Sequence, residues 1–352
     1  MVNQIRPFKI AGRSIGPNDP PYCIAEVGIN HNGDLAIAKQ MIEAAKSAGA
    51  DAVKFQTFKA EEFCGDAQQP FTYKSQNKSV TESMLAMFKR YEFPPEHWKS
   101  IKTHCESVGI TFFSTPQNRS DLDLLMKVGM PAIKVGSDDF TNLPLLRGYV
   151  ESKLPLILSC GMSDLAEVHQ ALDSARWFEG YPVALLLCTS QYPTPPEDVN
   201  INKLTTLQQA FPSLLLGFSD HTQSSLAAAM AISFGARIFE KHFTLGKEMP
   251  GPDHWFSAEP DELTEWIKTI RTADTLLGSR LVRPTQGELV NKKNFQRIIV
   301  AATNIKTGET FTETNLAMRR VTDGQGFPPN MYWRLLGRRA WRDFAKFSAI
   351  QL

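Results

Sequence analysis

The sequence predicts an α/β fold, a (β/α)8 TIM barrel followed by a small β-rich domain. Short apolar, β-rich runs alternate with helix-length amphipathic segments along most of the 352 residues. Continuous apolar strands separated by helices are typical of a parallel sheet that is covered by helices. Eight such units within roughly 255 residues fit a closed barrel, which typically takes about 250.

The eight predicted strands are short and apolar, and several follow a turn that contains Gly or Pro. They are residues 23–28, 52–55, 110–114, 132–135, 156–159, 184–188, 214–219 and 237–241. Helical patterns such as LAIAKQMIEAAKSAG and PEHWKSIKTHCESVG lie between them. A doubly wound open sheet is the alternative, but we would expect it to carry fewer strands and a Gly-rich nucleotide-binding turn. The sequence contains no GxGxxG motif.

Two regions depart from this repeat. Residues 58–94 follow the second predicted strand and are too long for a bare connection, which is typical of a lid or binding segment, with a decorative insertion as the alternative. After a helical pattern at 260–278, a polar connector leads to a tail that reads as short strands. We therefore expect a barrel domain at 1–278, a linker at 279–294, and a second domain at 295–352 that is marginal in size for folding alone.

Composition and charge describe an ordinary soluble globular protein. Apolar residues make up 42% of the chain, charged residues 21%, and the net charge is +1. This balance gives no reason to expect nucleic acid or an anionic membrane as a partner, and no stretch approaches the roughly 18 apolar residues of a membrane span. The five cysteines have no CxxC spacing, and the N-terminus has no signal-peptide core. We therefore expect reduced thiols and a cytoplasmic location.

Polar residues end every predicted strand, where the chemistry of a barrel of this kind lies. Strand alternation places three pairs of them on common faces, namely Lys54 with Gln56, Ser219 with His221, and Glu240 with His242. A lone strand-end lysine is more often a solvated surface residue. Lys54 and Lys134 together, however, would bring two ammonium groups into the barrel mouth, where an anion should offset them. The hydroxyl donors that favour a phosphate or carboxylate pocket are Ser114, Thr115, Ser137, Ser190 and Ser219.

The two histidines that end the last two strands suggest a metal site. His221 and His242 lie on neighbouring strands, with Glu240 and Asp253 close in sequence. Either histidine alone would more often be a satisfied core residue. Because no third Cys or His ligand is evident, we expect a partly hydrated divalent ion instead of structural zinc. Two imidazoles favour Mn²⁺ over Mg²⁺, and Co²⁺ is a further alternative.

Several long motifs in order resemble the sialic acid synthase family, which includes the N-acetylneuraminate, legionaminate and pseudaminate synthases. The motifs are IAEVGINHNGDLAIAKQMIEAAKSAGADAVKFQT, FFSTP, IKVGS, CTSQYPTPPEDVNI, GFSDHT, EKHFTL and GPDH. The resemblance covers nearly the whole chain, including a tail similar to the family's small antifreeze-like (SAF) domain. It implies a metal-dependent condensation of phosphoenolpyruvate with an N-acylated hexosamine, such as N-acetylmannosamine or a 2,4-diacetamido-2,4,6-trideoxyhexose. The products would be a nine-carbon 2-keto acid and phosphate.

The resemblance also implies roles for individual residues. Those matched to phosphoenolpyruvate binding are Lys54, Thr115, Lys134, Ser137, Ser190 and Ser219, and those matched to the metal are His221 and His242. We expect catalytic roles for Glu26, Glu240 and His242. The residues expected to bind the sugar are Glu26, Gln56, Tyr73, Asp139, Tyr192, Asp253 and Arg320. The match of Arg320 to an arginine that reaches a partner subunit's site implies a domain-swapped homodimer.

The sequence departs from the bacterial family pattern at a few places, which leaves the sugar unidentified. Gln117 stands where an aromatic residue is usual, Asp138 replaces a glycine, and Cys160 replaces a threonine. RRVTDGQG stands where KRPGNG is usual, around Arg320. Two rival hypotheses are an octulosonate- or heptulosonate-phosphate type of synthase and a degenerate barrel with a carbohydrate-binding tail. The tail counts against the first, and the presence of Lys54, His221 and His242 counts against the second.

Overall fold

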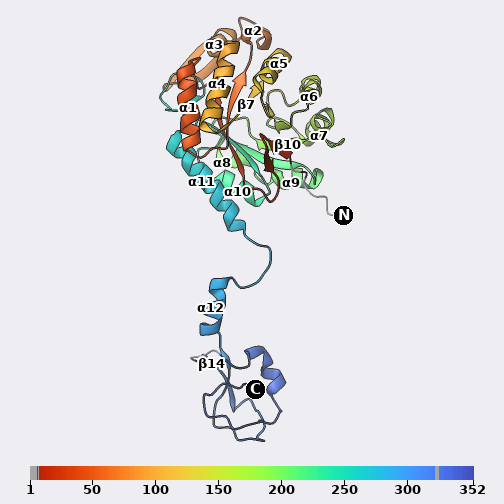
Figure 1. Ribbon diagram of the computed structural model, residues 1–352, viewed down its shortest axis with the longest axis vertical. Coiled ribbons are helices and arrows are strands. Elements are labelled where there is room, and N and C mark those ends of the chain that lie inside the picture. The colour runs from red at the N-terminus through yellow and green to blue at the C-terminus, as the bar shows by residue number, and fades with distance from the viewer. Residues whose placement is uncertain (1–5, 7, 322–324) are drawn as a thin grey trace. The chain divides into compact units, whose positions relative to one another are not determined.

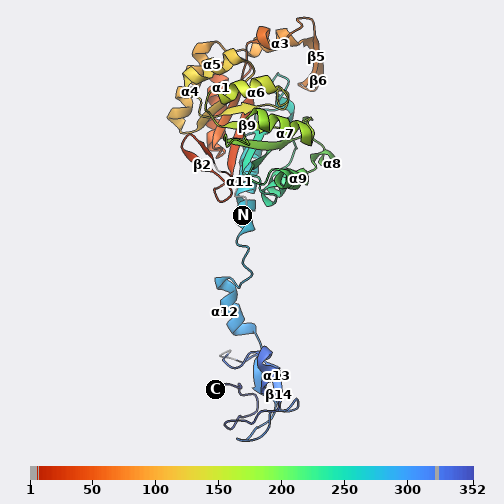
Figure 2. The ribbon, with the colours of Figure 1, turned by 90° about the vertical axis from the view of Figure 1, so that its right-hand side faces the viewer.

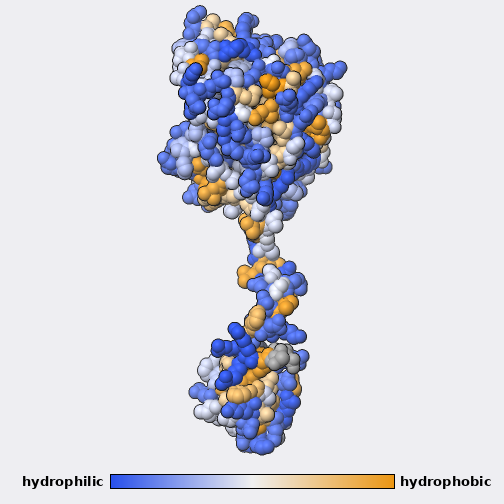
Figure 3. All heavy atoms as spheres, turned by 90° about the vertical axis from the view of Figure 1, so that its left-hand side faces the viewer, coloured by the Kyte–Doolittle hydropathy of each residue, from blue (hydrophilic) through white to orange (hydrophobic). Residues whose placement is uncertain are grey.

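The computed structural model describes the chain except for residues 1–5, 7 and 322–324. The chain divides into two compact units, Met1–Gly278 and Ser279–Leu352 (Figure 1). Among the described residues, no helix has the length and apolar character needed to cross a membrane. On the face of the first unit drawn in Figure 3, hydrophilic residues predominate and apolar residues form small groups.

The first unit is a closed barrel of eight parallel strands. In their order around the barrel the strands are β10 (Val183–Cys188), β11 (Leu215–Asp220), β12 (Ile238–His242), β3 (Tyr22–Gly28), β4 (Ala52–Thr57), β7 (Thr111–Pro116), β8 (Ile133–Val135) and β9 (Leu156–Ser159). All eight correspond to predicted strands, so the predicted (β/α)8 barrel is confirmed. Nearly every strand residue is buried, because side chains packed inside the barrel and helices outside it cover both faces of the sheet.

Helices surround the barrel, and some of them begin at side-chain caps. They are α1 (Leu35–Ser47), α4 (Pro95–Val108), α5 (Arg119–Val128), α6 (Leu143–Val150), α7 (Leu165–Ser174), α8 (Pro196–Val199), α9 (Lys203–Ala210), α10 (Leu226–Ser233) and α11 (Pro260–Leu277). Asp34 caps α1 by accepting hydrogen bonds from two backbone N–H groups, and Asp164 caps α7 through a capping box. Gly109 ends α4 in the left-handed conformation that glycine adopts without strain.

The predicted excursion after β4 is a folded element with its own small core. It contains α2 (Ala60–Phe63), the antiparallel hairpin of β5 (Pro70–Ser75) and β6 (Lys78–Ser83), and α3 (Met84–Tyr91). Its buried residues Phe58, Ala60, Met87 and Tyr91 form a separate cluster together with Ile29 from the turn after β3. Figure 2 shows the hairpin beside α3, at the edge of the barrel unit. A second hairpin, β1 (Phe8–Ile10) with β2 (Arg13–Ile15), was not predicted.

The second unit has a separate core and less regular structure. It begins with α12 (Gln286–Phe295), followed by β13 (Ile298–Ala301), β14 (Leu316–Arg319), η2 (Pro329–Met331) and α13 (Tyr332–Leu335). Isolated bridges, such as Ile305 with Phe344, join the remaining extended segments. Helix α12 occupies the second half of the expected linker and ends one residue inside the expected second domain. Thr285 and Glu288 form a capping box there, and none of the helix residues is buried.

Candidate active site in the barrel mouth

A cavity of about 620 Å³ opens at the carboxyl ends of the barrel strands. It receives side chains from the ends of all eight strands or from the loops that follow them. The predicted site residues that line it are Glu26, Lys54, Gln56, Tyr73, Thr115, Lys134, Ser137, Ser190, Tyr192, Ser219, His221, Glu240, His242 and Asp253. These residues are up to about 230 positions apart in the sequence, and closure of the barrel brings them together. Alternation along each strand determines which side chains point inward.

Two lysines and two glutamates form a buried charge network at the base of the cavity. Lys54 Nζ lies 2.8 Å from Glu26 Oε2 and 3.7 Å from Glu240 Oε2. Lys134 Nζ lies 3.5 Å from Glu240 Oε1 and donates a hydrogen bond to the Val135 carbonyl at 3.0 Å. We expected an anion to offset the lysines. Glu240 contacts both ammonium groups, and Glu26 is the register partner of Lys54 on β3 and β4, so carboxyl groups of the chain itself offset part of this charge.

The four charges have different protonation preferences. Burial raises the pKa of Glu26, and the charge of Glu240 raises it further, although Lys54 acts in the opposite direction. Burial would also raise the pKa of Glu240, but Lys134 and Lys54 outweigh it and the pKa is lowered. Burial lowers the pKa of Lys134. Glu26 is therefore the carboxyl group that most readily holds a proton, and Glu240 is the ionised one.

Hydroxyl groups form an arc beside the lysines. Ser137 Oγ accepts a hydrogen bond from the Gly161 backbone N–H at 3.0 Å, and Ser219 Oγ donates one to Glu240 at 3.2 Å. Within the described part of the chain, buried Ser190 Oγ and Ser159 Oγ have no hydrogen-bond partner. A Cβ atom at Gly161 would lie 2.3 Å from Ser190 Oγ and 2.7 Å from Ser137 Oγ. Glycine at this position therefore keeps a polar recess open between the two serines.

Ser159 and Gly161 were not among the predicted site residues. Ser159 ends β9 and faces the cavity, so the rule that located Ser219 could also have identified it. Ser114 was expected among the hydroxyl donors of the cavity, but it lies outside the lining. Its neighbour Thr115 faces the cavity, and the Ser114 hydroxyl lies 2.7 Å from Thr57 Oγ1 on the adjacent strand. The importance of Gly161 has no signal in a single sequence, because it depends on the approach of two serines from other strands. The recess forms only when the ends of neighbouring strands come together in the closed barrel.

His221 and His242 face each other with ring centroids 5.4 Å apart. His221 Nδ1 lies 2.8 Å from the Thr189 carbonyl, so Nδ1 carries a proton and Nε2 is the nitrogen that can bind a metal. Burial lowers the pKa of His221, but Cys188 and the Thr189 carbonyl outweigh burial and raise it. His242 Nδ1 is buried and has no hydrogen-bond partner among the described residues. Burial and the neighbouring positive charges lower the pKa of His242 well below its usual value, so its imidazole is neutral.

These features fit a divalent metal held by two imidazoles. Neutral imidazoles with free lone pairs are metal ligands, and a hydrogen bond from the other ring nitrogen, as His221 makes to Thr189, is the usual means of orienting one. No cluster of three or more His, Cys, Asp or Glu suited to a metal occurs within the described ranges. A metal here would therefore need water and substrate oxygens to complete its coordination, which corresponds to an open catalytic site.

Aromatic side chains form the outer wall of the cavity. Phe71 and Tyr73 come from β5, Phe88 from α3, and Trp255 and Phe256 from η1 (His254–Phe256) after β12. Lys74 Nζ lies 4.6 Å above the Trp255 ring. Of these residues only Tyr73 was assigned to the site from the sequence, as a sugar-binding residue. The wall gives the outer half of the cavity an apolar character that contrasts with its charged base.

Hydrogen bonds fasten the β5–β6 hairpin and the loop after β12 to each other. The Gly251 N–H donates to Ser75 Oγ at 3.0 Å, and Gln76 Nε2 donates to the Glu248 carbonyl at 3.1 Å. His254 then ties the same loop to the barrel, with Nδ1 2.7 Å from Thr244 Oγ1 and Nε2 3.1 Å from Asn32 Oδ1. We call the His254 contacts, together with the Ser75 and Gln76 contacts, the mouth clasp.

The remaining predicted residues have distinct environments. Gln56 Nε2 donates to Glu26 Oε1 at 3.2 Å. Burial, followed by the charge of Glu26, raises the pKa of Asp253 to about 7. Asp139 was expected to face the sugar, but it lies outside the cavity lining. Its carboxylate accepts a hydrogen bond from Asn142 Nδ2 at 2.9 Å, and Asp138 lines the cavity in its place.

Gln117 and Cys160, which depart from the family pattern, and Arg320 lie in three different environments. Gln117 lines the cavity, whereas Cys160 is buried and its thiol lies 3.4 Å from the Leu186 carbonyl. Arg320 belongs to the second unit. Its Nε donates to the Phe295 carbonyl at 2.9 Å, and its guanidinium lies over the Phe295 ring.

Comparison with known proteins agrees with the motif resemblance. The sequence model of the NeuB family matches residues 41–281. N,N'-diacetyllegionaminic acid synthase of Legionella pneumophila is 37% identical over 322 residues, which is 90% of this chain and 90% of that protein. The protein of the same name from Campylobacter jejuni is 36% identical over 330 residues, covering 93% of this chain and 98% of its own.

A solved structure extends this agreement to three dimensions. The crystal structure of N-acetylneuraminic acid (sialic acid) synthetase from Leptospira borgpetersenii, in complex with citrate, has a TM-score of 0.73 and 30% sequence identity. The match covers 83% of this chain and 98% of that chain. The resemblance inferred from the motifs is thus confirmed. The chain is an enzyme that belongs to the NeuB family.

Proposed function

We propose that this enzyme condenses phosphoenolpyruvate with an N-acylated hexosamine and produces a nine-carbon 2-keto sugar acid and phosphate. The observation that carries the proposal is the cavity itself. Its base holds two buried lysines beside serine hydroxyls without partners among the described residues, and a pair of facing imidazoles lies next to them. The relatives, which are named as synthases of sialic-type acids, support the same reaction.

The charged base suits the anionic substrate. Lys134 has no carboxylate closer than 3.5 Å within the described residues, and it lines the same cavity as the recess between Ser137 and Ser190 that Gly161 keeps open. A phosphate or carboxylate there would receive charge-assisted hydrogen bonds from the lysine and hydroxyl donors. Lys54, with Thr115 Oγ1 at 3.2 Å, would hold the other anionic group of phosphoenolpyruvate.

His221 and His242 would hold the divalent metal, for which we propose Mn²⁺, with Mg²⁺ and Co²⁺ as alternatives. When bound, the ion would act as a Lewis acid that polarises the carbonyl of the open-chain sugar. The Thr189 carbonyl would keep His221 in the tautomer that presents Nε2. Tyr192, whose ring centroid lies 4.2 Å from that of His221 and 5.6 Å from that of His242, would limit water on this side.

The two glutamates would divide the proton transfers. Carbon 3 of phosphoenolpyruvate attacks the sugar carbonyl carbon, and water then adds to the resulting cation at C2 before phosphate leaves. Glu26, with its raised pKa, would supply the proton to the sugar oxygen as that oxygen becomes an alcohol. Glu240 is ionised and would accept a proton from the attacking water. The two carboxyl groups thus have environments that separate acid from base.

The outer wall and its polar groups would bind the acceptor sugar. Gln56, Tyr192 and Asp253 offer hydrogen-bonding groups, and the aromatic wall offers apolar contact for acetamido methyl groups. Both N-acetylmannosamine and 2,4-diacetamido-2,4,6-trideoxymannose fit this description. We also propose that the enzyme is a domain-swapped homodimer in which Arg320 of one subunit reaches the site of the other.

Phosphate release tests this function. The enzyme would be incubated with phosphoenolpyruvate and each candidate sugar, with and without Mn²⁺. We expect release that requires both a hexosamine and the metal, and a product whose mass identifies the sugar. The His242→Ala variant should lose activity and stay folded, because the side chain borders a polar cavity. Release that is insensitive to chelator would contradict the metal role, and no release with any hexosamine would contradict the function.

A further inference from the structure

We infer that Asp220, Lys241 and Trp266 position the two histidines from outside the barrel, although none of the three faces the cavity. We call them the outer clamp. The inference rests on the proposed two-histidine metal site and deepens it, by naming residues that determine how far apart its ligands lie. They act through the backbone of the histidines, so they are positioning residues.

Register and alternation connect the outer clamp to the histidines. Asp220 and Lys241 are paired neighbours on β11 and β12. Each immediately precedes a histidine, and successive strand residues point to opposite faces. The side chains of Asp220 and Lys241 therefore point outward behind the strand ends from which His221 and His242 point inward. A contact between the two outward side chains fixes the distance between the two strand ends.

Every polar atom at the centre of the outer clamp is engaged. Asp220 Oδ1 accepts hydrogen bonds from the N–H and hydroxyl of Thr222, at 2.9 and 2.7 Å. Asp220 Oδ2 accepts one from Trp266 Nε1 at 2.8 Å and lies 3.3 Å from Lys241 Nζ. Lys241 Nζ donates to the Thr222 carbonyl at 2.6 Å. The backbone is thus held on both sides of His221 and directly before His242.

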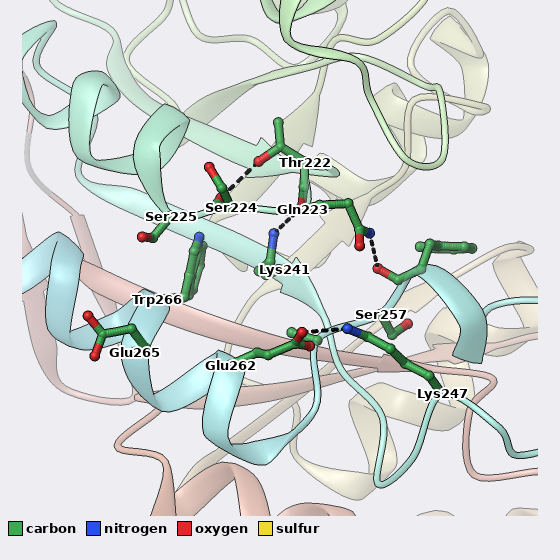
Figure 4. Close-up of a pocket in the computed structure, with 12 residues that line it drawn as sticks. Thr222, Gln223, Ser224, Ser225, Lys241, Lys247, Ser257, Glu262, Glu265 and Trp266 are labelled. Carbon is green, nitrogen blue, oxygen red and sulfur yellow. Dashed lines mark hydrogen bonds and ion pairs between the residues drawn. The ribbon is translucent and has the colours of Figure 1, made fainter.

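Figure 4 shows Lys241, Thr222 and Trp266 together on the outer side of the barrel, around a small pocket of about 200 Å³. Asp220 and Trp266 are 1% and 2% exposed, and Lys241 is 7% exposed. A buried ion pair is weak evidence for added stability, because desolvation offsets most of its attraction, but its directional contacts restrict geometry. Two histidines that bind one metal ion need a fixed distance between their imidazole rings, and restricted geometry would supply it.

The backbone ladder of β11 and β12 ends at the Asp220–Lys241 pair, so the spacing of the histidine side chains beyond it depends on side-chain contacts as well. His242 Nδ1 has no hydrogen-bond partner in the described part of the chain, so its ring depends on the backbone position and on packing against Tyr192 and Phe256. His221 is oriented by Thr189, which lies on the loop after β10. Two described sets of side-chain contacts join the histidine-bearing strand ends directly. They are the Ser219–Glu240 hydrogen bond on the inner face and the outer clamp on the outer face.

The barrel offers a matched control at its opposite end. Asp51 precedes β4 and accepts a hydrogen bond from the Cys23 N–H at 2.8 Å. It also pairs with Arg13 and Arg271. It is a mostly buried carboxylate that joins strand ends at the amino-terminal face, away from the cavity. Asp51→Asn should therefore cost stability as Asp220→Asn does, without changing the spacing of the histidines.

The experiment compares Mn²⁺ binding by the full-length wild-type, Asp220→Asn, Trp266→Phe and Asp51→Asn proteins, measured by the electron paramagnetic resonance signal of free Mn²⁺. Circular dichroism would report folding and Tm. We expect Asp220→Asn to weaken Mn²⁺ binding about 10- to 100-fold, as removal of ligand-orienting partners generally does. Trp266→Phe keeps an aromatic ring and removes one donor, so its loss should be smaller, about threefold to tenfold. Asp51→Asn should bind like wild type.

Three outcomes would overturn the inference. Asp220→Asn could lower Tm as Asp51→Asn does and leave Mn²⁺ affinity unchanged, in which case the clamp is only structural. If Asp220→Asn does not fold, wild-type affinity in Trp266→Phe would lead to the same conclusion. Absence of Mn²⁺ binding by the wild type would instead remove the two-histidine site itself, and the inference with it. This third result differs from the first two because it appears before any substitution is made.

Discussion

At the scale of single residues, the two lysines of the cavity have different partners and therefore different tasks. Lys54 is held 2.8 Å from Glu26, while Lys134 has its nearest described carboxylate at 3.5 Å and is only 2% exposed. An ammonium group that is buried but loosely paired is available to an incoming anion. Lys134 is thus the side chain most dependent on phosphoenolpyruvate for its charge balance.

This difference predicts the effect of Lys134→Met, which keeps length and removes charge. Loss of one charge-assisted contact costs about 2 kcal/mol, or about 30-fold in affinity. We expect the KM for phosphoenolpyruvate to rise by about that factor and the KM for the sugar to change little. Steady-state kinetics would measure both. Lys127→Met on the exposed face of α5 is the control and should behave like wild type. An unchanged KM for phosphoenolpyruvate in Lys134→Met would contradict the assignment.

Sequence reasoning located most cavity residues but not their contacts. Lys54, His221 and His242 follow from strand alternation alone, since their strands are apolar and clearly bounded. Asp139 was misplaced, because residues after a strand no longer alternate and a nearby amide, that of Asn142, holds the carboxylate. The pairing of both lysines with glutamates could not be predicted, since it depends on which inward faces converge when the barrel closes.

At the scale of elements, the mouth clasp shapes one side of the cavity. It joins the β5–β6 hairpin, the loop after β12 and the turn after β3 through contacts at Ser75, Gln76 and His254. His254 has acceptor and donor neighbours that suit a neutral ring, with Asn32 Oδ1 accepting from Nε2. Burial lowers the pKa of His254 to about 4. The His254 contacts of the mouth clasp therefore form with the neutral imidazole.

The clasp makes stability depend on pH with a definite sign. The unfolded chain protonates His254 near pH 6.5, while the folded barrel resists protonation until about pH 4. Stability from this group is therefore complete above pH 6.5 and is lost as the pH falls toward 4, at up to about 1.4 kcal/mol per pH unit. His254→Gln should flatten this dependence. Urea midpoints from pH 4.5 to 7.5 would measure it.

His31 serves as the internal reference for that measurement. Burial, followed by the charge of His254, lowers the pKa of His31 in the same direction, to about 3, and the larger cause, burial, remains in His254→Gln. In the variant, the free energy of unfolding should still fall at acid pH because of His31. The part of that fall that comes from protonation of His254 should be absent. Parallel curves for wild type and variant would show that His254 is not the neutral buried group described here.

The elements themselves were predictable to different degrees. The eight barrel strands were identified within two residues at every end, because burial on both faces leaves continuous apolar runs. The β5–β6 hairpin was recognised only as an excursion, since its strands are short, polar and largely exposed. The hairpin of β1 and β2 has three residues a strand, too few for a periodic pattern.

At the scale of the whole molecule, the two units carry opposite charge. Residues 279–352 contain 13 Lys and Arg against 5 Asp and Glu, a net charge of +8, so the remaining residues carry −7. Exposed apolar side chains also occur at the end of α11, in the connector after it and on α12, namely Leu276, Leu277, Leu281, Val282, Leu289, Val290 and Phe295. A basic unit with exposed apolar residues beside it supports the proposed homodimer, in which opposite charges would meet.

The homodimer predicts complementation between two inactive variants. Arg320→Ala and His242→Ala should each be inactive alone. After subunit exchange, a mixed dimer contains one site with an intact His242 from one chain and Arg320 from the other, so about a quarter of wild-type activity should return. Phosphate release would measure the recovery, and native mass spectrometry would verify the mixed dimers. Mixed dimers without activity would contradict a site shared between subunits.

The central claim is that the cavity joins phosphoenolpyruvate to a hexosamine with cleavage of the C–O bond. Phosphoenolpyruvate labelled with ¹⁸O at the bridging oxygen tests it most directly. The enzyme, the sugar and Mn²⁺ would be added, and the label followed by mass spectrometry. We predict that the label leaves with phosphate in an amount equal to the nine-carbon acid formed, because water supplies the new oxygen at C2. Label retained in pyruvate or in the acid, with unlabelled phosphate, would contradict the account.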